Sequence, residues 1–331
     1  MTVDHDVGAA VRVLLNDSSA TLTGLPGGAN NRVWVVDGAG GRFLAKASPP
    51  RQANDRDRTR CELAFSSFLW AHGVRCVPRP IAANLEHGIG IYEYVDGIGI
   101  SVVDAPLVAQ AVEFARCLFE LSKEDDARAL MDAADARFSI DGQLSVVDAR
   151  VQRLIAADLD DDAGAFVRSA LVPAWKQVHE EALASPVIGI LPARLRVLSP
   201  SDFGFHNALQ RADGRVIFFD FEYAGWDDPA KMLVDVFLQP AVRVHRSNVP
   251  AFADAITAPA PADRSVVVER AHALFPVLRI KWTTILLNEL LPDAWARRVF
   301  AGRGDRSQRI AEQIARARTL LSSSDRLEEP A

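Results

Sequence analysis

The chain has 331 residues, of which 49% are hydrophobic and 24% charged, and its formal net charge is −6. This composition is typical of a large, well-buried globular protein and excludes a disordered or low-complexity chain. The mild acidity and the scattered arginines argue against a nucleic-acid partner, which would require a basic patch or stripe.

The start of the chain, residues 1–13, carries two aspartates and lacks the basic and apolar regions of a secretory signal. No apolar stretch reaches the length of a transmembrane helix, so we expect no membrane contact. Three cysteines, Cys61, Cys76 and Cys117, match neither a paired disulfide set nor zinc-ligand spacing. These features together predict a cytoplasmic protein with reduced thiols.

The first hundred residues predict a small antiparallel sheet with one main helix. Glycines at 38, 40 and 41 indicate a hairpin turn. The helix should be capped by Asn54 or Asp55 and end at Gly73. The expected strands are Thr21–Gly24, Arg32–Asp37, Arg42–Ala47, Val74–Pro80 and Gly90–Val95.

From Pro106 onward the spacing of apolar residues is mostly helical, with an exception over 195–221, where short strands and loops are expected. The predicted helices are Leu107–Leu121, Val147–Ala157, Phe166–Leu183, Pro229–Leu238, Arg264–Leu291 (one helix or two) and Ser307–Leu321. The pattern predicts an α+β protein with an N-lobe over 1–97, a larger helical C-lobe over 98–331, and a cleft between them.

Asp202, Asn207 and Asp220 form the most informative pattern in the chain. Phosphoryl transfer to a hydroxyl needs a carboxylate that accepts the proton and oxygen ligands that hold Mg²⁺. Asp202 and Asn207 are five positions apart, as on the catalytic loop of kinases. Asp220 ends an apolar run at 216–219, so we expect it at the rigid end of a buried strand.

Asp202-Phe203-Gly204 spells the metal-binding tripeptide of protein kinases, but the sequence argues against that reading. A metal aspartate at 202 should follow a catalytic loop with its own aspartate and asparagine. Residues 179–201 contain neither Asp nor Asn. We therefore interpret Asp202 as the proton acceptor and Asp220 as the metal ligand.

Three upstream features fit a nucleotide site. Gly27 and Gly28 lie between two predicted strands, where glycines allow backbone amides to approach phosphate oxygens. This loop lacks the ending of a P-loop and is also compatible with a plain turn. Lys46 interrupts an apolar strand, and Glu62 on the following helix can pair with it.

The order of the glycine-rich loop, Lys46, Glu62, the 91–97 connector, Asp202 to Asn207 and Asp220 resembles the aminoglycoside phosphotransferase and choline kinase-like family over residues 20–240. The resemblance implies a bilobal protein kinase-like fold that phosphorylates a small molecule. It implies adenine bound by the connector backbone at Glu93, Tyr94 and Val95. It also implies Lys46 on the α and β phosphates, Mg²⁺ on Asn207 and Asp220, and Asp202 as catalytic base. ATP is the expected co-substrate, with GTP left open.

Pro200 departs from the family pattern, in which a histidine stands two residues before the catalytic aspartate. The departure leaves open a catalytically silent, nucleotide-binding regulatory module, and a nucleotidyl transferase on the same fold is a second alternative. We interpret the neighbouring His206 as a loop histidine held by packing, not as a general base.

The acceptor is a hydroxyl-bearing small molecule such as a sugar, amino sugar, aminoglycoside or amino alcohol, and two hints about its charge conflict. One set of acidic residues could attract a cation: Asp158, Asp160, Asp161, Asp162, Glu222, Asp227 and Glu289. A basic set could face an anion or a sugar: Arg243, His245, Arg246, Arg279 and Lys281. Trp282 could stack on a sugar ring, although aromatics in apolar helices usually belong to the core.

Overall fold

The structure is a computed structural model that describes residues 3–26, 30–51, 55–159, 161–184, 189–257, 261–302, 306–323 and 326–327. It divides into two compact units. The first unit comprises Met1–Ile100, Asn207–Ala224 and Ala296–Gly304, and the second comprises Ser101–His206, Gly225–Trp295 and Asp305–Ala331.

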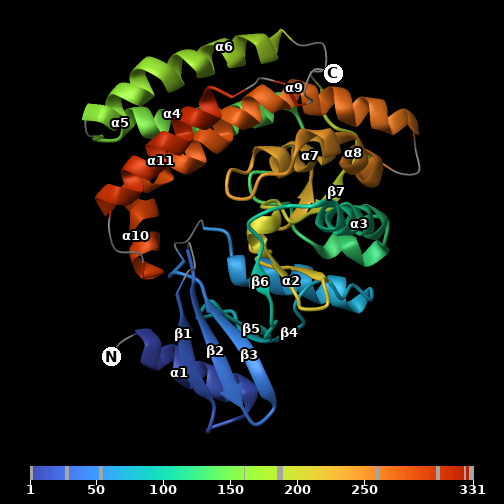
Figure 1. Ribbon diagram of the computed structural model, residues 1–331, viewed down its shortest axis with the longest axis vertical. Coiled ribbons are helices and arrows are strands. Elements are labelled where there is room, and N and C mark those ends of the chain that lie inside the picture. The colour runs from blue at the N-terminus through green and yellow to red at the C-terminus, as the bar shows by residue number, and fades with distance from the viewer. Residues whose placement is uncertain are drawn as a thin grey trace. The chain divides into compact units, whose positions relative to one another are not determined.

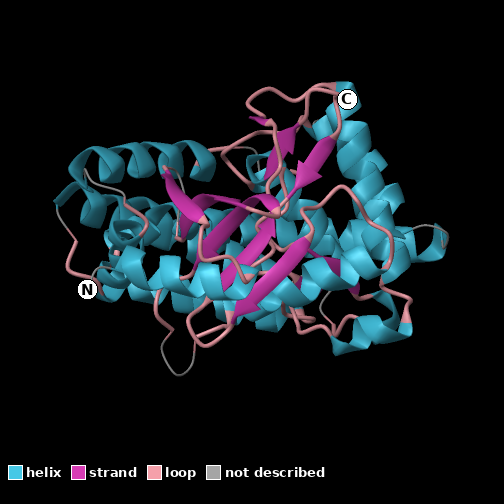
Figure 2. Ribbon diagram, turned by 90° about the horizontal axis from the view of Figure 1, so that it is seen from below, coloured by secondary structure: helices cyan, strands magenta, loops and turns pink. Residues whose placement is uncertain are grey.

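The first unit contains a five-stranded antiparallel sheet with the strand order β1-β2-β3-β5-β4. Figure 2 draws the strands of the protein in magenta. The strands of this sheet are β1 (Thr21–Leu25), β2 (Arg32–Gly38), β3 (Gly41–Ala47), β4 (Pro80–Asn84) and β5 (Ile89–Glu93). The predicted hairpin turn joins β2 to β3, with Gly38 paired to Gly41. Gly41 has φ +115°, a conformation that residues with a Cβ rarely adopt.

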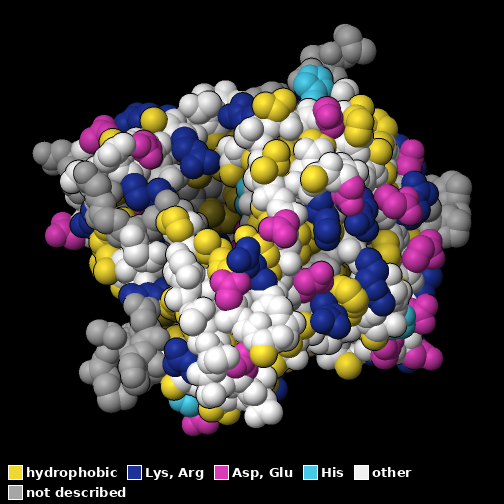
Figure 3. All heavy atoms as spheres, turned by 60° about the horizontal axis from the view of Figure 1, so that its bottom comes forward, with side chains coloured by type: hydrophobic (Ala, Val, Ile, Leu, Met, Phe, Trp, Pro, Cys, Tyr) yellow, Lys and Arg dark blue, Asp and Glu magenta, His cyan; other side chains and the backbone are white. Residues whose placement is uncertain are grey.

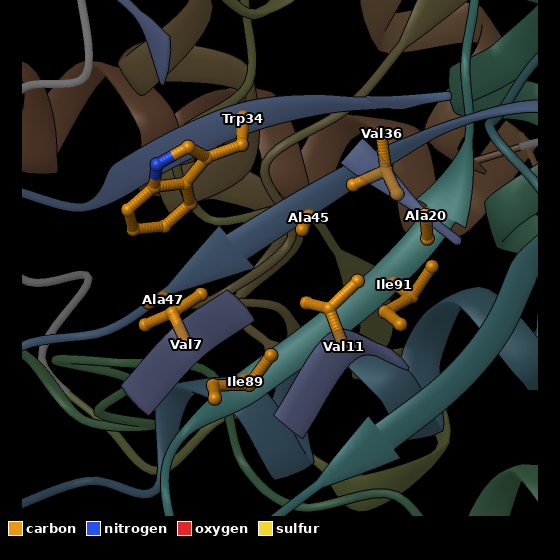
Figure 4. Close-up of a cluster of buried hydrophobic side chains, with 9 residues drawn as sticks. All are labelled: Val7, Val11, Ala20, Trp34, Val36, Ala45, Ala47, Ile89 and Ile91. Atoms are coloured by element: carbon orange, nitrogen blue, oxygen red, sulfur yellow. The ribbon is translucent and has the colours of Figure 1, made fainter. Parts of the chain in front are cut away.

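Helix α1 (Val3–Leu15) packs on this sheet and was not among the predicted helices. Val7 and Val11 lie four residues apart on its buried face, where they join Ile89 and Ile91 of β5 in one apolar cluster (Figure 4). Trp34 of β2 closes the same cluster. A helix at this point covers one face of the sheet and gives the first unit its core.

Helix α2 (Arg58–Ala71) begins later than predicted, because Asp57 is its N-cap and accepts a hydrogen bond from the Arg60 amide. The predicted end holds: Gly73, with φ +80°, follows the helix. The strand predicted over Val74–Pro80 was wrong, since β4 begins at Pro80. Val74 and Val77 are buried, but they lie in a segment without regular secondary structure. Their apolar side chains gave this segment the sequence pattern of a strand.

A second sheet joins distant parts of the chain in the first unit. Strand β6 (Ile98–Gly99) pairs with β8 (Ala208–Gln210), which forms a hairpin with β9 (Val216–Phe218). The expected boundary at 97/98 lies close to Ile100, where the first segment of this unit ends. Residues 207–224 nevertheless belong to the first unit, because the β8–β9 hairpin within them pairs with β6.

The second unit is mainly helical (Figure 1). Its helices are α3 (Ala105–Leu121), α4 (Ile140–Ala156), α5 (Asp161–Phe166), α6 (Val172–Leu183), α7 (Pro229–Leu238), α8 (Val249–Thr257), α9 (Pro261–Leu286) and α11 (Arg306–Leu321), while α10 (Pro292–Phe300) runs from this unit into the first. Strands β7 (Val197–Ser199) and β10 (Gly225–Asp227) pair beside them. Every residue of α7 is buried, so α7 forms the centre of this unit, packed on α9.

None of the described helices has the length and apolarity needed to cross a membrane. On the face shown in Figure 3, basic and acidic side chains of the described residues are interspersed among apolar ones. This arrangement agrees with the mixed, mildly acidic composition of the chain.

Candidate functional site

Lys46 lies on β3 at the centre of the first unit's sheet, opposite Val33 of β2 and Gly90 of β5. Only 8% of the residue is exposed. Its Nζ donates to Glu62 Oε2 at 2.6 Å and also to Asp220 Oδ1. Glu222 Oε2 lies 3.6 Å away. The expected Lys46–Glu62 pair is thus part of a larger group of one ammonium and three carboxylates.

Burial and ion pairing compete in this group. Burial raises the pKa of Glu62 to about 7, although the Lys46 ammonium opposes the rise. Burial by itself would lower the pKa of Lys46, but attraction by Asp220, Glu62 and Glu222 holds that pKa well above its usual value. The ammonium therefore stays charged across the physiological range.

Asp220 and Asn207 are held at the same end of the β8–β9 hairpin. Ala208 pairs with Phe218, and the next residue, Phe219, donates its amide to the Asn207 carbonyl at 3.0 Å. Asp220 has φ +69°, a left-handed conformation that Asp tolerates better than most residues. One third of its side chain, 33%, is exposed, so an ion can reach its carboxylate.

The donor set at this hairpin end fits a magnesium ion that arrives with a polyphosphate. Among the residues that the structure describes, no group of three or more His, Cys, Asp or Glu is arranged to hold a metal by itself. Mg²⁺ is commonly bound by one or two carboxylates together with substrate phosphates and water. The Asp220 carboxylate and the Asn207 amide oxygen are oxygen donors of that kind.

Glu222 is a residue of this site that sequence reasoning misassigned. It was grouped with residues that attract a cationic acceptor, but only 1% of it is exposed. Asn31 donates to its Oε2 at 2.7 Å, and Arg58 Nη1 lies 3.6 Å from its Oε1. Burial would raise the pKa of Glu222, but Lys46 and Arg58 lower it below its usual value. The sequence signal that could have placed Glu222 in this site is its position two residues after Asp220.

The predicted connector follows β5 directly. Glu93 is the last residue of the strand, and its amide donates to the Arg79 carbonyl at 2.8 Å. Tyr94 and Val95 have no regular secondary structure, and the Arg42 guanidinium lies 5.5 Å from the centre of the Tyr94 ring. Gly27 and Gly28 lie outside the described residues.

Asp202 belongs to the second unit and follows β7. Its Oδ1 lies 3.0 Å from His206 Nε2, within hydrogen-bond distance, and 33% of its side chain is exposed. His206 is therefore more than a packed loop histidine, because it contacts the carboxylate directly. The preceding Ser201 has φ +66° and donates its amide to Ser199 Oγ at 3.0 Å.

A buried charge cluster, formed by Asp227 at the end of β10 and by Lys231 and Asp235 of α7, reaches this loop. Lys231 Nζ contacts Asp227 at 2.6 Å and Asp235 at 3.0 Å, and it lies 3.5 Å from Ser201 Oγ. Burial raises the pKa of Asp227 to about 6. The contact between Lys231 and Ser201 supports the residue that precedes Asp202. Pro200 stands in this loop where the family pattern has a histidine.

Burial in the second unit removes several candidate acceptor contacts from the surface. Lys281 Nζ and Trp282 Nε1 both bind Asp235 Oδ1, at 3.0 and 2.7 Å, and both residues are buried. Asp227 is also buried, and Glu289 is buried and paired with Arg309. These side chains are buried and already bound to partners within the protein, so they are not available to an acceptor. The hints that placed them around an acceptor were wrong.

Comparison with known proteins gives a family and a fold. A family model described as the phosphotransferase enzyme family matches residues 21–258. No curated protein matches the sequence significantly.

Several solved structures are similar in fold at low sequence identity. A choline/ethanolamine kinase family protein from Mesorhizobium loti is 17% identical with a TM-score of 0.58, covering 97% of this chain and 96% of that one. A choline kinase from Cryptosporidium parvum Iowa II is 13% identical with a TM-score of 0.58, covering 97% and 100%. A spectinomycin phosphotransferase, solved with ADP and spectinomycin, is 12% identical with a TM-score of 0.58, covering 99% and 96%. These likenesses confirm the predicted α+β kinase-like fold.

Proposed function

Because the chain belongs to the phosphotransferase enzyme family, we propose that it is an ATP-dependent small-molecule kinase that phosphorylates a hydroxyl group. The observation that carries the proposal is the group formed by Lys46, Glu62 and Asp220. A buried ammonium held by one carboxylate beside a second, accessible carboxylate is the arrangement that binds a metal-chelated triphosphate.

In this proposal the first unit binds the nucleotide. Glu62 holds Lys46 extended toward the α and β phosphates, and Gly27 and Gly28 remain the proposed positions where backbone amides approach phosphate oxygens. The adenine base is bound by the backbone of 93–95. Asn207 and Asp220 hold Mg²⁺, which neutralises charge on the phosphate oxygens when it is bound. The ADP present in the spectinomycin phosphotransferase structure supports ATP as the co-substrate.

Asp202 is the proposed base. It accepts the proton of the acceptor hydroxyl while that oxygen bonds to the γ phosphorus, and the bond from phosphorus to ADP breaks. His206, 3.0 Å from the carboxylate, orients it. Choline kinases and a spectinomycin phosphotransferase share the fold, so a small hydroxyl compound is the proposed acceptor class.

The test is an acceptor screen with ATP and Mg²⁺ on the wild type, Asp202→Asn and a control, Asp125→Asn, at an exposed surface position. The panel contains aminoglycosides, amino alcohols and monosaccharides. We expect the kcat of Asp202→Asn to fall by about 10²- to 10⁴-fold, the usual contribution of a general base. Its nucleotide affinity should stay within twofold, and the control should match the wild type. Equal turnover in the wild type and Asp202→Asn would remove the base assignment.

Mass spectrometry of the product separates the alternatives. A kinase adds one phosphate to the acceptor, whereas a nucleotidyl transferase adds a nucleotide. A catalytically silent module, the alternative that Pro200 raised, would bind Mg·ATP and transfer nothing to any acceptor. The contact of Lys231 with the Ser201 hydroxyl favours an active loop, because it supports the residue next to Asp202.

A further inference from the structure

Asn31 is a buried residue of the first unit whose side-chain amide is only half satisfied. The residue is 5% exposed. Its Nδ2 donates to Glu222 Oε2 at 2.7 Å, whereas its Oδ1 is buried and accepts no hydrogen bond from any residue that the structure describes. A buried polar atom without a partner is destabilising. The amide is therefore placed for its contact with Glu222 and not for its own hydrogen bonding.

The oxygen that Asn31 contacts also faces Lys46. Lys46 Nζ lies 3.6 Å from the same Glu222 Oε2, while Arg58 Nη1 lies 3.6 Å from Oε1. Glu222 is 1% exposed, so bulk water does not compete for its oxygens. Asn31 thus fixes the oxygen of Glu222 that attracts the Lys46 ammonium.

The backbone at Asn31 is tied to the strand that carries Lys46. Strand β2 begins at the next residue, and Val33 of this strand is paired with Lys46 of β3. Asn31 also stands three residues after Gly28, one of the two glycines proposed to approach the phosphates. A single side chain therefore links the glycine-rich segment and the β2–β3 ladder to Glu222.

Lys46 depends most on Glu222 when a nucleotide binds. Asp220 is a close partner of Lys46 and also the proposed ligand of Mg²⁺. A carboxylate that neutralises a divalent cation attracts a neighbouring ammonium less strongly. Glu62 and Glu222 then remain as the carboxylates that hold Lys46. Asn31 fixes the second of them.

We propose that Asn31 is a positioning residue of the nucleotide site, which holds Glu222 against Lys46 when the nucleotide and its metal bind. The inference rests on the proposed function and adds a residue that determines nucleotide affinity through Glu222. It makes a specific demand on the pair: position 31 must donate a hydrogen bond, and position 222 must accept it.

The test measures the Kd of Mg·AMP-PNP by calorimetry in two backgrounds, the wild type and Glu222→Gln. Asn31→Asp should raise the Kd about tenfold in the wild type, because two carboxylates then face each other in the interior. In the Glu222→Gln background the same substitution should raise the Kd at most about twofold, since the amide introduced at 222 donates to the carboxylate at 31. Asn31→Ala, which adds no charge, should raise the Kd about fivefold in the wild type and at most about twofold in the second background.

Asn84→Asp is the matched control. Asn84 ends β4 in the same unit, and its Oδ1 accepts a hydrogen bond from the His87 amide at 3.0 Å. A carboxylate keeps that contact, so this variant adds the same charge and should leave the Kd within twofold of the wild type. Urea unfolding shows that each variant is folded, and Asn31→Ala decides the question if Asn31→Asp does not fold. An equal rise of the Kd in both backgrounds would overturn the inference, because Asn31 would then act independently of Glu222.

Acceptor turnover separates failure of this inference from failure of the proposed function. If the wild type binds Mg·AMP-PNP but phosphorylates no acceptor, the kinase proposal fails, while the measured affinities still decide the role of Asn31. If the wild type is an active kinase and the Asn31 variants bind nucleotide equally well, the role of Asn31 is refuted and the kinase proposal stands. A wild type that does not bind Mg·AMP-PNP would overturn both.

Discussion

Glu62 is a buried carboxylic acid whose charge depends on its ion-pair partner. Only 6% of the residue is exposed, and burial raises its pKa to about 7 despite the neighbouring Lys46. In the unfolded chain its pKa returns to about 4.5. Between these two values the folded protein holds a proton that the unfolded chain has released, so Glu62 costs stability as the pH rises.

Replacing Glu62 by Gln removes this titration. The stability advantage of the wild type over Glu62→Gln should decrease by about 3 kcal/mol as pH rises from about 4.5 to about 7, because each pKa unit corresponds to about 1.4 kcal/mol. Urea unfolding across this pH range measures the difference. Glu86→Gln, at an exposed position in the same unit, controls for the loss of one charge. A difference that stays constant with pH would contradict the assignment.

Some site residues could be found from the sequence, and others could not. Lys46 stands out because a lysine interrupts an apolar strand, and Asp220 because it ends a buried one. Asn31 gave no such signal, because it stands in a polar stretch, and Glu222 gave only its position two residues after Asp220. Their contact joins residues 191 positions apart, and only the folded chain brings them together.

Among the elements, β10 shows how closely two backbone segments approach each other, and it pairs with β7, the strand that precedes Asp202. Trp226 exchanges hydrogen bonds with the neighbouring segment: its amide donates to the Met131 carbonyl at 2.9 Å, and its carbonyl accepts from Ala133 at 2.8 Å. A Cβ on Gly225 would lie 2.1 Å from the Met131 oxygen. Gly225 also has φ +155°, which side chains other than hydrogen rarely permit.

Gly225→Ala should therefore destabilise the protein by about 3 kcal/mol or more, since neither backbone can yield without breaking this pairing. Gly189→Ala is the matched control, because nothing lies within 4 Å of a Cβ built there. Thermal or urea unfolding of the two variants checks the difference. Similar stabilities would show that the 131–133 segment can move away without cost.

Helices and strands were predicted correctly where nearby residues mark their ends. Helix α7 was predicted with its observed bounds, because Pro229 stands at its first turn and Asp228 caps it. Helices α1 and α8 were missed, because the apolar face of each can be recognised only from the element on which it packs. The strand predicted over 74–80 was wrong because the buried valines of this segment pack into the core although they lie in a loop.

At the scale of the whole molecule, nucleotide binding should raise the unfolding temperature much more when magnesium is present than when it is absent. A ligand that binds only the folded protein stabilises it by about 2.7 kcal/mol at a concentration one hundred times its Kd. Mg·AMP-PNP at that excess should shift the melting temperature upward by several degrees. EDTA should remove most of the shift, and Asp220→Asn should reduce it. A shift of equal size with and without magnesium would refute the proposed metal ligands.

The discontinuity of the first unit affects how the protein can be made. Three separate stretches build that unit, and the last of them ends at residue 304. A ribosome that has released only the first hundred residues has supplied Lys46 and Glu62, but not the hairpin that brings Asp220 and Glu222. The buried ammonium then has one carboxylate partner in place of three. The ion-pair group of the first unit must therefore wait, while segments of the second unit emerge, for the β8–β9 hairpin that precedes Asp220 and Glu222.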